Sequence, residues 1–95
     1  AADAAAAGRA LGILIAMSDD WVDYEKHHER EGNLRYVVGD DAARRAELIA
    51  LARKVAQEGV DAVSAQESDI DLAPVIRWHL DDLISTVSGL GSVYL

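Results

Sequence analysis

Three stretches of the chain repeat apolar residues at steps of three and four, which is the period of an amphipathic helix. They cover about residues 3–30, 41–58 (or on to 65) and 72–88. The pattern predicts an all-α protein, a small antiparallel three-helix bundle. With 95 residues, the chain is long enough for one domain and too short for two, so residues 1–95 are expected to form a single helical domain.

The first stretch contains a possible break at Ser18. Ser18 followed by Asp19 and Asp20 is typical of a helix N-cap with acids in the first turn, which would divide the stretch into two helices. The apolar stripe nevertheless keeps its phase across this point, so we predict one long helix. The residues expected on its inner face are Leu11, Leu14, Ile15, Ser18, Trp21, Val22, Glu25 and His28.

Residues 34–38 are rich in β-branched and aromatic side chains and follow the turn signal Gly32-Asn33. We expect an extended connector or a short strand there. Asp40 is then the expected N-cap of the second helix, and Asp41 lies in its first turn. Asp41 is also three and four residues before Arg44 and Arg45, a spacing that allows ion pairs on a helix.

The second and third helices are expected to face the core with one stripe each. Gly59 either ends the second helix or lies within a helix that continues to about Ala65. Asp71 can cap the third helix, and Pro74 is tolerated in a first turn. The stripes are Ala43, Leu48, Ile49, Leu51, Ala52, Val55 and Ala56, and then Ile76, His79, Leu80, Leu83, Val87 and Leu90.

Charge and composition narrow the possible functions. The net charge is −8, and −6 of it lies between Glu58 and Leu95. Such an acidic chain repels phosphate backbones, which argues against nucleic-acid binding, and it suits a basic protein partner or a Mg²⁺ ion held by carboxylates. The absence of cysteine excludes disulfides and thiolate metal sites.

The most apolar segment, residues 4–17, does not fit a membrane span. It contains Arg9 and is shorter than the ~20 apolar residues that a spanning helix needs. It also lacks a basic leader, so we expect a cytoplasmic protein that does not enter membranes. A mature form left after signal-peptide cleavage is the alternative.

Two sets of polar residues have spacings that could carry metal chemistry. Glu25 and His28 form an E-x-x-H pair, which lets one helix present a carboxylate and an imidazole to one ion, and His79 on the third helix is the nearest further ligand. Metal-binding bundles also use glutamates from other helices, and a second E-x-x-H is lacking. The alternative is that Glu25 and His28 lie at the exposed edge of the helical stripe and bind no metal.

The second set joins the second and third helices. Glu58 and Asp61 have E-x-x-D spacing, Lys54 precedes Glu58 by four residues, and Asp82 lies just before an apolar pair about 20 residues further on. Over residues 48–90 this resembles the all-α nucleotide pyrophosphohydrolases of the MazG and phosphoribosyl-ATP type. The resemblance implies that Glu58, Asp61 and Asp82 would bind Mg²⁺ and that Lys54 would contact a phosphate.

Two positions depart from that family pattern. Gln57 stands where the family usually carries a second glutamate, and His79 replaces the first acid of the second pair. Mg²⁺-dependent hydrolysis uses several carboxylates because the ion prefers oxygen ligands and must offset charge on the phosphates. Acids on exposed helix faces produce the same spacing without any site.

We therefore expect a non-catalytic helical module that binds another protein, with no resident cofactor. An alanine-rich core favours burial against a second copy of the chain, and the hydrophobic tail Ser92–Leu95 favours it too. The expected assembly is a homodimer whose acidic surface binds a basic partner. The alternatives are the Mg²⁺-dependent pyrophosphohydrolase, or a degenerate relative of it, and the metal-binding bundle.

Overall fold

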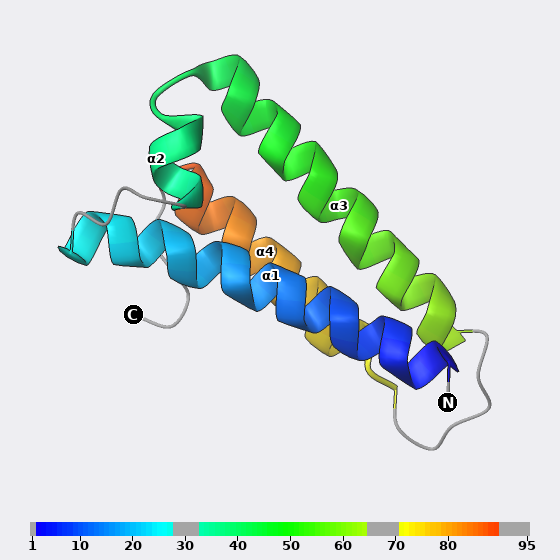
Figure 1. Ribbon diagram of the computed structural model, residues 1–95. Helices are drawn as coiled ribbons and strands as arrows, with labels where there is room; N and C mark the ends of the chain where they lie inside the picture. The colour runs from blue at the N-terminus through cyan, green and yellow to red at the C-terminus, as the bar shows by residue number, and fades with distance from the viewer. Residues whose placement is uncertain (1, 28–32, 65–70, 90–95) are drawn as a thin grey trace.

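Four helices follow one another in the computed structural model, which describes residues 2–27, 33–64 and 71–89. They are α1 (Ala2–His27), α2 (Leu34–Val38), α3 (Ala42–Ser64) and α4 (Ala73–Val87). Helices α1, α3 and α4 run in alternating directions and pack on one another, and α2 lies at the end where α3 begins (Figure 1). The predicted all-α bundle is confirmed, with one short helix more than expected.

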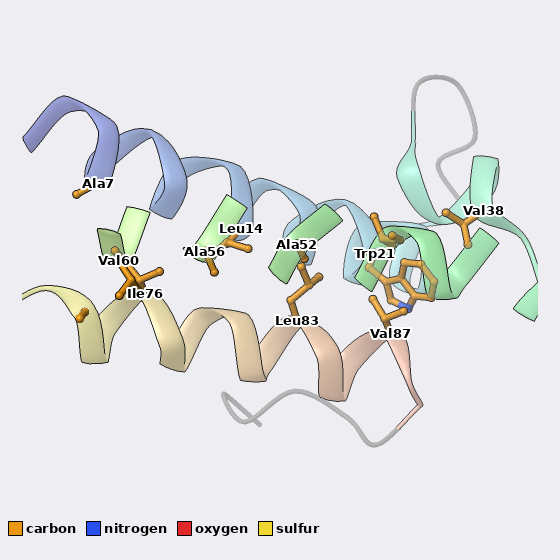
Figure 2. Close-up of a cluster of buried hydrophobic side chains, with 12 residues drawn as sticks. Ala7, Leu14, Trp21, Val38, Ala52, Ala56, Val60, Ile76, Leu83 and Val87 are labelled. Carbon is orange, nitrogen blue, oxygen red and sulfur yellow. The ribbon is translucent and has the colours of Figure 1, made fainter. Parts of the chain in front are cut away.

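The core is a row of layers between the three long helices, and the side chains that α1 contributes grow along the row. Ala7, Leu14 and Trp21 are seven residues apart on one face of α1, and all three are buried. Figure 2 shows Ala7 near Val60 and Ile76 at one end, and Trp21 at the other. The core therefore widens from the N-terminal end of α1 toward its C-terminal end.

The core is thus wedge-shaped, and Gly59 lies at its narrow end. A methyl group at Gly59 would lie 2.6 Å from Cβ of Ala10 on α1 and 3.2 Å from Cδ1 of Ile76 on α4. Helices α1 and α3 can approach this closely only because the glycine has no side chain. In Figure 1 the two helices converge at this end and diverge toward α2.

Short helix α2 fills the wide end of the wedge. The Asn33 side-chain amide donates a hydrogen bond to the carbonyl oxygen of Asp20 on α1 (2.7 Å). The Arg35 guanidinium lies 4.7 Å from the centre of the Trp21 ring, and Val38 is buried in the core cluster. From α3, Arg44 Nη1 donates to the carbonyl of Val37 (3.2 Å). Helix α2 is thus held by both long helices that it separates.

The prediction of an extended segment at residues 34–38 is wrong, because the ends of this segment decide its conformation. Asn33 caps the helix, and its Oδ1 accepts from the backbone N–H of Tyr36 (3.2 Å). At the other end Gly39 adopts φ +61°, and its N–H donates to the carbonyl of Arg35 (2.9 Å). An asparagine before and a glycine after five residues are helix-capping signals. They outweigh the strand preference of the residues between them.

The N-cap of α3 also differs from the prediction by one residue. Asp41, not Asp40, accepts from the first backbone amides of the helix, those of Ala43 (2.8 Å) and Arg44 (3.4 Å). The predicted Asp41–Arg44 pair is present but long, at 3.9 Å. Asp40 instead forms an ion pair with Arg35 of α2 (3.0 Å). Asp40 therefore contacts α2 and does not cap α3.

Other predicted boundaries are confirmed. Helix α1 passes through Ser18 without a break, and α3 passes through Gly59 and ends at Ser64, close to the longer alternative. Asp71 Oδ1 accepts from the N–H of Ala73 (3.0 Å) and Pro74 lies in the first turn of α4. The predicted helix ends beyond residues 27 and 64, the loop 66–70, Leu90 and the tail Ser92–Leu95 lie outside the described residues.

The buried stripes are confirmed only in part. Leu14, Trp21, Leu48, Ala52, Ala56, Ile76, Leu83 and Val87 are buried as expected. Ile15, Ala43 and Leu51 were expected in the core but are exposed. Helical periodicity gives the relative direction of side chains on one helix, and it does not say how much of that helix the neighbouring helices cover.

We expect Gly59→Ala to lower the free energy of unfolding by about 1–3 kcal/mol, because the added methyl group forces α1 and α3 apart. The matched control is Gly12→Ala on α1, where nothing lies within 4 Å of the added methyl group. There the higher helix propensity of alanine should stabilise the protein by up to ~1 kcal/mol. Urea unfolding followed by circular dichroism measures both, and equal effects of the two substitutions would contradict the wedge.

Candidate interaction surface

The residues that resemble the pyrophosphohydrolase pattern lie on two helices, Lys54, Glu58 and Asp61 on α3 and Asp82 on α4, and they do not share one surface. Glu58 is exposed and lines a hollow between α3 and α1, together with Arg9. The groove between α3 and α4 is lined instead by Gln57, Arg53, Arg77 and Asp81. Helix α4 therefore packs near the side of α3 that carries Gln57, and the glutamate faces the other neighbour.

Asp82 is separated from the other proposed ligands by burial. The Asp82 residue is 1% exposed on α4, and its backbone carbonyl accepts from the Thr86 hydroxyl (2.9 Å). Asp61 is exposed on α3 and accepts from the Gln57 side-chain amide (2.7 Å), while Lys54 is exposed one turn before Glu58. The structure brings Gln57 and Asp61 together, exposes Glu58 beside α1 and buries Asp82 on α4.

The other metal hypothesis falls largely outside the described part of the chain. The Glu25 side chain and all of His28 lie outside the described residues. His79 is partly exposed on α4 and packs edge-on against Trp78, with ring centres 4.9 Å apart. Among the side chains that the structure describes, no three carboxylates or imidazoles are grouped so that they could hold a metal ion.

The most distinctive surface is an apolar face formed by α1, α2 and α3. We call it the open face and define it by Ile13, Met17, Val37, Leu51 and Val55. Val37 is 59% exposed, Leu51 51% and Ile13 39%, and Met17 and Val55 are partly exposed. A monomeric protein rarely exposes large apolar residues side by side, and such patches mark interaction sites.

Helix α2 forms a ridge at one end of the open face. Val37 lines two shallow hollows, one on each side of α2. The hollow on the α1 side also contains Ile13 and Met17, and the hollow on the α3 side contains Leu48 and Leu51. The exposed side chain of Val37 therefore stands between two apolar depressions.

The opposite end of the open face is hollowed where the helices come closest. This hollow is lined by Ala6, Ala10 and Gly59, with Ile13 and Val55 on its inner side toward the centre of the face. Ile13 lines both this hollow and the one beside α2. The open face is therefore continuous along α1, with a ridge at one end and a depression of small residues at the other.

Charged residues border both ends of the open face. Arg9 on α1 and Glu58 on α3 line the hollow near Gly59. Asp20 on α1 and Arg44 and Glu47 on α3 line the hollows beside α2. On α1 the basic Arg9 lies at one end of the face and the acidic Asp20 at the other. On α3 the acidic Glu58 lies at one end and the basic Arg44 at the other. The face carries a formal charge of −1 from these five residues, against −8 for the whole chain.

Sequence reasoning missed this surface because it assigned Leu51 to the core and residues 34–38 to a connector. The only available signal was the breadth of the apolar stripe on the second helix, which exceeds what one neighbouring helix can cover.

Within the described residues, none of the helices combines the length and the apolar character needed to cross a membrane.

Comparison with known proteins does not assign this surface. No protein-family model matches the chain, and searches of curated proteins and of solved structures find no match.

We expect Mg²⁺ to leave the stability of the protein unchanged, because Glu58 and Asp82 are not placed to share an ion. The melting temperature of wild type and of Glu58→Gln should respond equally to millimolar Mg²⁺ or Mn²⁺. Differential scanning calorimetry, with a chelator as the reference, measures this. Two results together would support the hydrolase hypothesis. The metal ion would stabilise wild type but not Glu58→Gln, and wild type would release pyrophosphate from a nucleotide.

Proposed function

We propose that this chain is a non-catalytic helical module that acts through protein contacts, as a homodimer that binds a further, basic protein in the cytoplasm. The observation that carries the proposal is the open face, where Ile13, Val37 and Leu51 are exposed on three adjacent helices. Covering this apolar area with protein would remove it from water, which is favourable by roughly 25 cal/mol per Å² before the costs of association.

The remainder of the described surface supports a basic partner. The acidic side chains Asp61, Asp71 and Asp81 are exposed on or beside α3 and α4, away from the open face. From Glu58 to Leu95 the sequence holds seven acidic residues and a single arginine or lysine, Arg77, whereas Arg53 and Lys54 lie on α3 just before this segment. Complementary charge speeds association and selects a partner of opposite sign. A dimer would carry two copies of this acidic surface.

The homodimer predicts a mass of two chains in solution. Sedimentation velocity over a micromolar concentration series should show the dimer, with its fraction rising with concentration. A mass of one chain throughout the series would contradict the homodimer.

The basic partner predicts that exposed acids contribute to binding. Any protein captured by wild type should be recovered several-fold less by the double variant Asp61→Asn with Asp81→Asn, because each lost charge pair contributes about 0.2–1 kcal/mol. Lys54→Gln, at an exposed position of α3, is the matched control and should retain or increase recovery. Quantitative mass spectrometry at low and high salt measures both, and equal recovery by all three proteins would contradict a basic partner.

A further inference from the structure

The two ends of the open face carry opposite features, which would meet if a second copy were turned end to end. One end carries the α2 ridge with Val37, and the other carries the hollow lined by Ala6, Ala10 and Gly59. A two-fold axis across the middle of the face, perpendicular to α1, places each end over the opposite end of a second copy. The ridge of each copy then lies over the hollow of the other.

The same rotation matches the border charges. It places α1 antiparallel to the second α1, so that Arg9 of each copy lies over Asp20 of the other. It likewise places Glu58 over Arg44 of the second copy along α3. Both pairs have opposite signs and occur twice, as two-fold symmetry requires, while the fifth border residue, Glu47, has no opposite charge placed over it. The apolar residues Ile13, Met17, Leu51 and Val55 lie between the charged ends.

The arrangement also completes the helical packing. Among the described helices, α4 packs on one side of the α1–α3 pair, and only the short α2 lies against the other side, at one end (Figure 1). Two such pairs facing each other form a four-helix layer, in which apolar side chains at steps of three and four meet as in helical bundles. Leu48, Leu51 and Val55 have this spacing on α3.

We propose that the open face is the dimer interface, and that its occupant is a second copy of this chain related by an end-exchanging two-fold axis. The inference rests on the proposed homodimer and adds its surface and geometry. A second copy fits better than the basic partner here, because the border charges nearly cancel and the centre is apolar. Homodimer interfaces are more apolar than transient ones, whereas a basic partner suits the acidic surface elsewhere.

The central test compares two exposed valines on different faces. Val37→Glu places a carboxylate on the α2 ridge, and Val75→Glu places one on α4, where Val75 is 43% exposed. We expect Val37→Glu to raise the dimer dissociation constant roughly thirtyfold or more, because a buried unpaired charge is strongly unfavourable. Val75→Glu should leave it unchanged. Sedimentation velocity measures both, and circular dichroism confirms that both variants are folded.

Leu51→Glu provides a second variant if Val37→Glu disturbs α2. Leu51 is 51% exposed on the long helix α3, so the substitution leaves the α2 caps intact. It should weaken the dimer to a similar extent. A dimer that withstands both Val37→Glu and Leu51→Glu overturns the proposal.

A charge exchange tests the direction of the axis. Glu58→Arg should weaken the dimer several-fold, since it opposes Arg44 of the second copy. In the Arg44→Glu background, which by itself loses the hydrogen bond to Val37, the same Glu58→Arg change should instead tighten the dimer, because opposite charges face each other again. Tightening in the Arg9→Glu background instead would overturn the end-exchanged geometry, because a two-fold axis parallel to the helices would pair Arg9 with Glu58.

The outcomes separate this inference from the proposed function. If wild type is a dimer that Val75→Glu dissociates and Val37→Glu does not, the interface is elsewhere and the homodimer remains. If wild type is a monomer at every concentration, both the homodimer and this interface fail.

Discussion

The close contact between Gly59 and Ala10 is the constraint on which the arrangement of the helices depends. With no side chain at position 59, α1 and α3 can approach until a single methyl group would clash with Ala10 and Ile76. Away from this point the side chains of α1 grow from Ala7 to Leu14 to Trp21, so the helices must diverge. The bundle is therefore a wedge, and a wedge needs something to fill its wide end.

Helix α2 fills that end, and its capping residues connect the fold to the surface. Asn33 and Arg35 bind α2 to α1 through the Asp20 carbonyl and the Trp21 ring, and Arg44 binds it to α3. Once α2 is held there, Val37 must project from the bundle between two apolar hollows. The narrow end, lined by Ala10 and Gly59, is correspondingly hollow. Ridge and depression thus have one physical origin, the difference in side-chain size along the core, and the proposed dimer interface depends on both.

The candidate chemistry shows where spacing ceases to be informative. Within one helix the spacing is informative, because residues three or four apart are neighbours. Gln57 and Asp61 on α3 are four apart, and their side chains form a hydrogen bond. Asp82 was expected to complete a site with Glu58 and Asp61, yet it is buried on α4 while Glu58 lines the α1–α3 hollow. Spacing within a helix fixes relative direction, but the contact between two helices decides which faces meet. Spacing along α3 therefore could not establish whether Glu58 and Asp82 would meet in one site.

The sequence by itself determined the all-α class, the extent of the long helices within the described residues, and most of the buried stripe, because helical period and local breakers are encoded in neighbouring residues. The caps of α2 were also encoded locally, in Asn33 and Gly39, although the β-branched residues between them obscured the signal. Only the tertiary structure decided that Leu51 is exposed, that Asp82 is buried, and that the described helices leave most of one face of the α1–α3 pair open. These outcomes depend on the rotation and separation of whole helices, which the contact at Gly59 and the insertion of α2 set together. No stretch of sequence read alone contains that geometry, since it arises from contacts between residues far apart in the chain.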